Sequence, residues 1–274
     1  MYIPNKFHFI WISVPGKEPN GVKSITDMRP ETQKLIMNWK TLHPGFALKL
    51  WTDNDAMELL RGYPKWLDFF NASQNIGERS DILRYLILKT EGGIYVDTDC
   101  QAKKNVSPII KAILASGKEI ALPETQVEGI TNWIIFSVVG AKFWDALEQN
   151  LFSTEFDISK KIPALYTLAT TGPWLLTATA QNHLDKVFVI DAVKVCVIES
   201  CVEEATRNGA YFVHVPEGSW HNFTVKTKTV QDIVDAPRVS VAIFATVLVA
   251  FAFVIYFRHR ARKDVQKKRT NKQK

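Results

Sequence analysis

Short apolar runs alternate along the chain with longer segments in which apolar residues recur every three or four positions. The short runs are typical of buried strands, and the longer spacing is typical of amphipathic helices. The pattern predicts strands at residues 7–14, 46–51, 94–99, 119–124, 132–139, 186–190 and 210–216, and helices at 30–44, 77–91 and 141–151. Asp53 is expected to cap a further short helix. Strands that alternate with helices predict an α/β fold with a largely parallel sheet flanked by helices.

The stretch GGIYVDTDC, residues 92–100, places two carboxylates at the end of one predicted strand. Side chains alternate between the two faces of an extended chain, so Asp97 and Asp99 are expected to point the same way. Ligands of α/β sheets gather at the carboxyl ends of strands, where these residues lie. Adjacent carboxylates repel each other unless a proton or a cation separates them, and oxygen ligands suit Mg²⁺ or Mn²⁺.

Two other interpretations of the paired acids stay open on this motif alone. Asp is common in solvated turns at strand ends. Phosphatases of the haloacid dehalogenase type also carry D-x-D after an apolar strand, but their pattern has Thr or Val two residues beyond the second Asp, where this chain has Gln101. The motif by itself therefore indicates a metal site without establishing one.

The segment upstream of the acids is more specific. ERSDILRYLILKTEGGIYVDTD, residues 78–99, resembles the signature of glycosyltransferase family 32, the DXD sugar-binding region family. This family includes fungal α-1,6-mannosyltransferases and inositol phosphoceramide mannosyltransferases, and related runs occur in large clostridial glucosylating toxins. Over residues 3–222, further blocks that resemble the family in the same order begin at Ile3, Asn38, Thr131, Thr171 and His214.

The resemblance implies a GT-A nucleotide-sugar-binding fold and a metal-dependent, retaining transfer of a hexose from a nucleotide-diphosphate sugar. It implies that Asp99 binds the metal directly and that Asp97 contacts the metal, the ribose or the sugar. GDP-mannose is the favoured donor, UDP-hexoses are alternatives, and a glycan or a glycolipid such as inositol phosphoceramide is the expected acceptor. A metal suits this reaction because the departing diphosphate develops negative charge that a cation stabilises.

Asp81 and Arg84 lie three positions apart and therefore share one face of the predicted helix. Without the resemblance they indicate a surface ion pair, worth less than about 1 kcal/mol. With it, both are expected to contact the donor sugar, with Arg79 as a weaker neighbouring candidate.

A late histidine is the third candidate metal ligand. His214 ends the apolar run AYFVH, and a lone His on a strand is more often structural than a ligand. The resemblance implies a late additional ligand and favours His214 over the nearby His221, and a nitrogen ligand favours Mn²⁺ over Mg²⁺. The other substrate-binding candidates from the resemblance are Trp11, Asn132, Thr171, Gly172 and Trp220. For Trp220, a contact to the leaving phosphate and a place in the core both stay open.

The C-terminal part differs in character from the rest. Residues 239–257 are nineteen consecutive residues without a charge, Gly or Pro. As a helix they would span roughly 28 Å, close to the thickness of the hydrocarbon core of a bilayer. They are predicted to form a transmembrane helix, after a catalytic domain at residues 1–230 and a linker at 231–238, and before a basic tail at 258–274.

The net charge of +6 comes from that tail. Residues 258–274 hold nine Lys or Arg and one Asp, whereas residues 1–257 carry a net charge of −2. Because the body has no basic stripe, nucleic-acid binding is not expected. The tail favours a cytoplasmic C-terminus and a luminal body in the Golgi or the endoplasmic reticulum. Residues 7–14 lack a persuasive signal-peptide cleavage site, which favours the cytosol, so the orientation stays open.

Sequons at Asn71, Asn105 and Asn222 give weak support to a secretory location. The three cysteines match no disulfide framework and no zinc-site spacing. The alternative function is a non-catalytic sugar-nucleotide or glycan-binding membrane protein, and the intact acids at 97 and 99 favour the enzyme over it.

Overall fold

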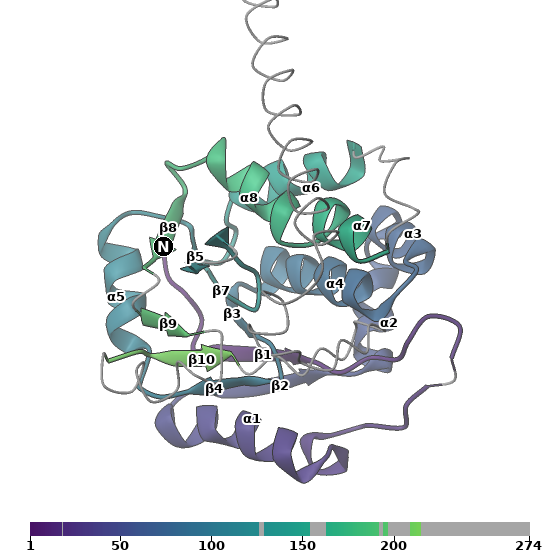
Figure 1. The fold of residues 1–274 in the computed structure, drawn as a ribbon, viewed down its shortest axis with the longest axis horizontal. Helices are drawn as coiled ribbons and strands as arrows, with labels where there is room; N and C mark the ends of the chain where they lie inside the picture. Colours follow the sequence, from purple (N-terminus) through teal and green to yellow (C-terminus); the bar gives the residue numbers. More distant parts are fainter. Residues whose placement is uncertain (18, 126–128, 154–162, 192–193, 197–208, 215–274) are drawn as a thin grey trace, which may run out of the picture. The chain divides into compact units, whose positions relative to one another are not determined.

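A seven-stranded β-sheet and the helices around it carry the candidate site (Figure 1). The computed structural model describes residues 1–17, 19–125, 129–153, 163–191, 194–196 and 209–214, which all belong to one unit, Met1–His221. The strand order is β2-β1-β3-β7-β5-β6, and β8 also pairs with β5. The strands of this sheet are β1 (Lys6–Ile10), β2 (Ala47–Trp51), β3 (Gly93–Val96), β5 (Ile120–Thr125), β6 (Gly129–Ile130), β7 (Ile134–Ser137) and β8 (Val187–Ile190).

The sheet is mixed, so the prediction of a largely parallel sheet is wrong. Strand β1 runs parallel to β2 and β3, and β5 runs parallel to β8. Strand β7 runs antiparallel to both β3 and β5, and β6 is antiparallel to β5. The connection from β5 to β7 is too short to hold a crossover helix, and short connections join antiparallel strands.

The helices begin where the sequence offers favourable first-turn residues, with Pro in the first turn of α1, α3, α5 and α8. In α2 the cap is Thr52, which shares a capping box with Asp55, so the prediction of Asp53 as the cap is one residue off. The helices in the described ranges are α1 (Pro30–Leu42), α2 (Asp53–Arg61), α3 (Pro64–Ala72), α4 (Ile76–Glu91), α5 (Ser107–Ala115), α6 (Phe143–Ser153), α7 (Pro163–Thr170), α8 (Pro173–Gln181) and a short 3₁₀ turn (Ile25–Asp27).

Helix α4 leads directly into β3 and is buried along most of its length. It ends at Glu91, the last residue of the predicted helix, Gly92 (φ 64°) follows, and Gly93 (φ 90°) begins the strand. Neither position has room for a side chain. A Cβ on Gly92 would lie 2.9 Å from the backbone nitrogen of Val139, and one on Gly93 would lie 2.8 Å from Nε2 of His8.

His8 is a fully buried histidine in β1 with two hydrogen-bond partners. Its Nε2 lies 3.0 Å from the carbonyl oxygen of Gly92, and its Nδ1 accepts the indole N–H of Trp51 at 3.1 Å. This pattern assigns the neutral imidazole with its proton on Nε2. Burial lowers the pKa of His8 to about 4, so the ring is uncharged at neutral pH.

A second, smaller sheet lies beside the first and has the order β4-β10-β9. Its strands are β4 (Cys100–Ala102), β10 (Phe212–His214) and β9 (Val195–Cys196). Strand β10 is antiparallel to β4 and places His214 opposite Cys100. This pairing joins the end of the described chain to the residues that follow the paired acids.

The predicted transmembrane segment, residues 239–257, lies outside the described residues, as do the linker and the basic tail. Among the helices that the structure describes, none combines the length and the apolar character needed to cross a membrane.

Candidate functional site

Asp97 and Asp99 lie in the turn between β3 and β4. Strand β3 ends at Val96, and the N–H of Cys100 donates to the carbonyl oxygen of Asp97 (3.0 Å). The prediction that both acids continue the strand is therefore wrong. The two carboxylates are brought near each other by the turn, and the alternation of side chains along a strand is not the cause.

His214 faces both acids. Its Nε2 lies 3.0 Å from Oδ1 of Asp99 and 3.9 Å from Oδ2 of Asp97. One ligand atom from each of the three residues can be chosen so that all lie within 4.8 Å of one another. We call Asp97, Asp99 and His214 the Asp/Asp/His cluster, and all three side chains are partly exposed.

The two oxygens of Asp97 have different neighbours. Oδ1 accepts a hydrogen bond from the hydroxyl of Tyr95 and lies 3.5 Å from Nη2 of Arg84. Oδ2 is the oxygen that faces His214. Helix α4 and strand β3 therefore hold one edge of this carboxylate, and its other edge stays directed to the cluster.

Asp81 and Arg84 form a buried ion pair next to this cluster. Their residues are 5% and 6% exposed, and Nη2 of Arg84 lies 3.3 Å from Oδ1 of Asp81. The guanidinium also donates to the carbonyl oxygen of Asn132 (2.7 Å) and lies over the ring of Tyr95 (4.4 Å). Because both residues are buried, the interpretation of this pair as a surface ion pair is wrong. Removing either partner would leave the charge of the other buried and uncompensated.

Residues from two other segments donate hydrogen bonds to the carboxylate of Asp81. The side-chain amide of Asn132 donates to Oδ1 (2.8 Å), and the hydroxyl of Thr171 donates to Oδ2 (3.0 Å). The hydroxyl of Tyr85 donates to the carbonyl oxygen of Thr171 (2.8 Å). The structure thus brings together four residues that the sequence predicted as substrate-binding: Asp81, Arg84, Asn132 and Thr171.

Two acids of the site, Asp81 and Asp97, have raised pKa values. Burial raises the pKa of Asp81 to about 6, and the nearby Arg84 opposes this shift. Burial also raises the pKa of Asp97, with Arg84 opposing the shift and the Asp99 carboxylate adding to it. Since these negative charges cost free energy, a cation at the cluster would stabilise their ionised forms.

The Asp/Asp/His cluster fits a divalent cation. It offers carboxylate oxygens and one imidazole nitrogen, a donor set that suits Mn²⁺. The oxygen of Asp97 that lies nearest His214 is also the one that Tyr95 leaves free. Within the described ranges this is the only group of three or more His, Cys, Asp or Glu side chains arranged to share an ion.

The remaining predicted residues lie apart from this network or outside the described chain. Gly172 caps α8 directly after Thr171, and a Cβ there would lie 2.9 Å from a backbone oxygen. Trp11 follows β1, where its backbone N–H donates to the carbonyl oxygen of Trp51, and its side chain is partly exposed. Arg79 lies over the ring of Phe70. Two predicted residues are outside the described ranges: Trp220 and His221.

Three residues of the site were not predicted from the sequence. Tyr95 lies on β3, two positions before Asp97. Side chains two positions apart in an extended chain point the same way, and this spacing could have predicted that the Tyr95 hydroxyl lies on the side of Asp97. Tyr85 lies one helical turn after Asp81, and that spacing places both on one face of the helix. Trp133 stacks on His214, and the sequence holds no signal for this contact across about 80 residues of chain.

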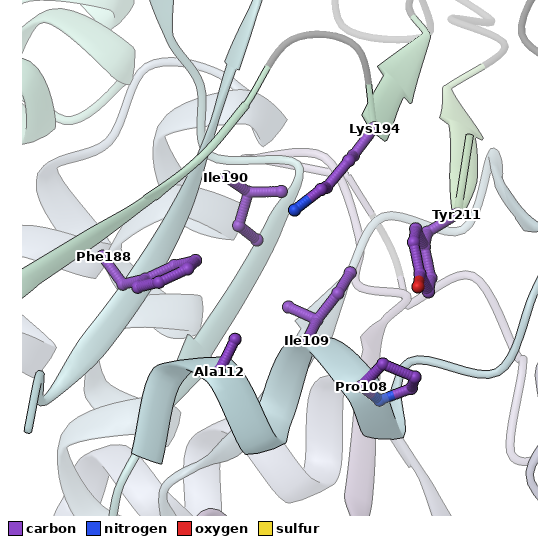
Figure 2. Close-up of a pocket in the computed structure, with 7 residues that line it drawn as sticks. All are labelled: Pro108, Ile109, Ala112, Phe188, Ile190, Lys194 and Tyr211. Atoms are coloured by element: carbon purple, nitrogen blue, oxygen red, sulfur yellow. The ribbon is translucent and has the colours of Figure 1, made fainter. Parts of the chain in front are cut away.

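A separate hollow lies between α5, β8 and the segment around Tyr211 (Figure 2). Its lining is mostly apolar, and the side chain of Lys194 reaches over it. None of the predicted site residues lines it. The lining residues are Pro108, Ile109, Ala112, Phe188, Ile190, Lys194 and Tyr211.

Sequence comparisons agree with the resemblance to the DXD glycosyltransferases. Residues 30–115 match the family described as "Glycosyltransferase sugar-binding region containing DXD motif". Inositol phosphoceramide mannosyltransferase 1 of Schizosaccharomyces pombe is 26% identical, over 96% of this chain and 76% of the relative. Mannosyl phosphorylinositol ceramide synthase CSH1 of Saccharomyces cerevisiae is 24% identical, over 80% of this chain and 57% of the relative.

Both relatives are named as enzymes of mannosyl transfer or synthesis, and the predicted resemblance to the DXD glycosyltransferases is confirmed. The chain spans about half the length of several curated relatives, such as 57% of CSH1 and 44% of SUR1. Among solved structures, the PaToxG glycosyltransferase is similar with a TM-score of 0.48 and 17% identity, over 66% of this chain and 70% of the other.

Proposed function

We propose that this chain is a metal-dependent, retaining hexosyltransferase of the GT-A type that uses a nucleotide-diphosphate sugar. The observation that carries the proposal is the convergence of Asp97 and Asp99 on Nε2 of His214, directly beside the buried pair of Asp81 and Arg84. A solvated turn, the simplest alternative for the two acids, does not require a histidine and a buried arginine at the same place.

In this proposal Asp97, Asp99 and His214 would hold Mn²⁺ or Mg²⁺. The bound cation supplies electrostatic stabilisation of the negative charge that develops on the departing diphosphate. Tyr95 and Arg84 fix Oδ1 of Asp97, so the carboxylate is already held in one orientation. Its side chain would therefore lose little conformational entropy when the metal binds.

Asp81 is the proposed acceptor of hydrogen bonds from hydroxyls of the donor sugar. Each carboxylate oxygen has two lone pairs. Asn132 and Arg84 both lie at Oδ1, whereas Thr171 is the described donor at Oδ2, so Oδ2 is the oxygen that can accept a sugar hydroxyl. Arg84 supports the charge of Asp81 and also reaches Asp97, so one cation couples the sugar side of the site to the metal side.

GDP-mannose is the favoured donor, and a glycolipid such as inositol phosphoceramide is the favoured acceptor. The support comes from the names of the relatives, which include mannosyltransferases of inositol phosphoceramide. UDP-hexoses and glycan acceptors are the alternatives. Anchoring through residues 239–257 in a Golgi or endoplasmic reticulum membrane is part of the same proposal and is supported by their apolar sequence.

The test is a turnover assay with the purified full chain and radiolabelled GDP-mannose, UDP-glucose or UDP-galactose. We expect metal-dependent transfer to inositol phosphoceramide, or slow hydrolysis of the donor without acceptor, with EDTA abolishing both. A chain that binds a nucleotide sugar but neither transfers nor hydrolyses it with Mn²⁺ or Mg²⁺ would support the alternative, a non-catalytic binding protein.

A further inference from the structure

Trp133 contacts two of the three members of the Asp/Asp/His cluster by separate routes. Its ring lies parallel to the imidazole of His214, with the centroids 4.9 Å apart and the planes at 9°. Its backbone carbonyl accepts the N–H of Asp97 at 2.8 Å. Trp133 is only 3% exposed, so both contacts lie inside the protein.

A residue of strand β10 also packs against the Trp133 ring. Phe212 packs edge-on against it, with a centroid distance of 5.6 Å and an interplanar angle of 82°. Phe212 and His214 are two positions apart on β10 and therefore point to the same side. The flat face of the indole thus restricts rotation of the His214 ring, and Nε2 stays directed to the acids.

The indole nitrogen of Trp133 is buried and has no hydrogen-bond partner among the residues that the structure describes. An unpartnered buried N–H costs folding free energy that a Phe or Leu side chain would not incur. Core packing alone therefore does not favour Trp here. The large flat face that stacks on His214 is the property that distinguishes the indole from an aliphatic side chain.

We infer that Trp133 is a positioning residue for the metal ligands, which it serves through its ring on His214 and its carbonyl on Asp97. The inference rests on the proposed function, because it concerns the same cluster. The hydrogen bond from the N–H of Asp97 to the carbonyl oxygen of Trp133 does not involve the side chain. Substitutions of the Trp133 side chain therefore test its contact with His214 alone.

The experiment measures Mn²⁺ affinity by electron paramagnetic resonance titration of the full chain, with and without GDP. It compares Trp133→Phe, Trp133→Leu, His214→Ala and the double variant Trp133→Leu/His214→Ala. Loss of an outer-shell contact typically weakens metal binding by about 10- to 100-fold. We expect Trp133→Leu to weaken Mn²⁺ binding about tenfold, Trp133→Phe to keep it within about threefold, and the double variant to match His214→Ala.

Wild-type Mn²⁺ affinity in Trp133→Leu would overturn the inference. The inference would also be overturned if Trp133→Leu weakened Mn²⁺ binding as much in the His214→Ala variant as it does in the wild type. Loss of affinity in Trp133→Phe would also overturn it, because a flat ring is still present. Thermal unfolding checks that each variant is folded, and Trp133→Met replaces Trp133→Leu if the latter is not. If the unsubstituted chain itself fails to bind Mn²⁺ with GDP, the proposed metal site fails and the inference with it. If the unsubstituted chain binds Mn²⁺ and Trp133→Leu binds it equally well, only the inference about Trp133 is overturned.

Discussion

Nη2 of Arg84, on helix α4, lies 3.5 Å from Oδ1 of Asp97 in the turn after β3. The same guanidinium nitrogen lies 3.3 Å from Asp81. One buried cation therefore serves two carboxylates that come from different elements of the fold. A substitution of Arg84 is expected to disturb both carboxylates at once.

Arg84→Lys keeps the charge but loses the planar fork that reaches Asp81, Asp97 and the carbonyl of Asn132 together. We expect kcat/KM for the donor to fall about a hundredfold. Arg84→Ala should also lower the free energy of unfolding by about 3–5 kcal/mol, because it leaves a buried charge unpaired. Steady-state kinetics and urea unfolding measure both effects, and Arg61→Lys, at an exposed position, is the control. Wild-type kcat/KM in Arg84→Lys would exclude Arg84 from the site.

Asp99→Asn preserves the shape of the side chain but removes its charge from the Asp/Asp/His cluster, where we propose that a metal binds. We expect turnover to fall at least about a hundredfold, as for loss of an electrostatic contact in a transition state. Far-UV circular dichroism should stay unchanged. Asp185→Asn, at an exposed position, makes the same chemical change away from the site. Near-normal activity of Asp99→Asn with EDTA present would contradict the metal role.

His8 makes stability depend on pH. Its pKa of about 4 in the folded state lies below the ordinary value of 6.5, so protonation favours unfolding. Its contribution is complete above about pH 6.5 and is lost as the pH falls toward about 4, by about 3 kcal/mol in total. The glutamine in His8→Gln cannot titrate. The difference in unfolding free energy between the wild type and His8→Gln should therefore shrink as the pH falls from about 6.5 to about 4. Urea unfolding at several pH values measures it, and a constant difference would contradict the assignment of a neutral ring.

Gly93→Ala should be more damaging than an ordinary glycine substitution. Both Gly93 and Gly117 have positive φ, at 90° and 70°, but only at Gly93 would a Cβ come within 3 Å of other atoms, on His8 and Lys6. We expect Gly117→Ala to cost about 1–2 kcal/mol of strain, and Gly93→Ala to cost more than about 3 kcal/mol because atoms must also shift. Equal midpoints of urea unfolding for the two variants would show that the space at Gly93 is not limiting.

The segment at residues 239–257 should hold the full-length protein in membranes after extraction with alkaline carbonate. An epitope after Lys274 should be digested by protease in sealed microsomes if the basic tail is cytoplasmic. A protected epitope, with no glycan on the body, would place the body in the cytosol. Release of the full-length protein by carbonate would contradict the anchor itself.

The sequence predicted most of the elements because their signals are local. Helix α4 has helical apolar spacing and ends at two glycines, and the structure places its end at the same residue, Glu91. The direction of β7 was not predicted, because it depends on pairing with β3 and β5, which lie elsewhere in the chain. Strand direction is a property of the whole sheet, so local apolar spacing carries little information about it.

The candidate site shows the same division. Asp97, Asp99 and His214 were predicted together, although the geometry that unites them is a turn and a strand pairing that the sequence pattern does not specify. Burial of the Asp81–Arg84 pair also escaped prediction. Charged residues three apart on a helix are usually solvated, and only the tertiary packing around α4 decides otherwise.

The distance along the chain between Asp99 and His214, 115 residues, has a consequence for how the protein is made. A ribosome adds about 5–20 residues each second, so the two acids emerge about 6–23 s before the histidine does. During that interval β3 and its turn can form while β10 does not yet exist. The Asp/Asp/His cluster therefore cannot be complete in the nascent chain until synthesis has passed His214.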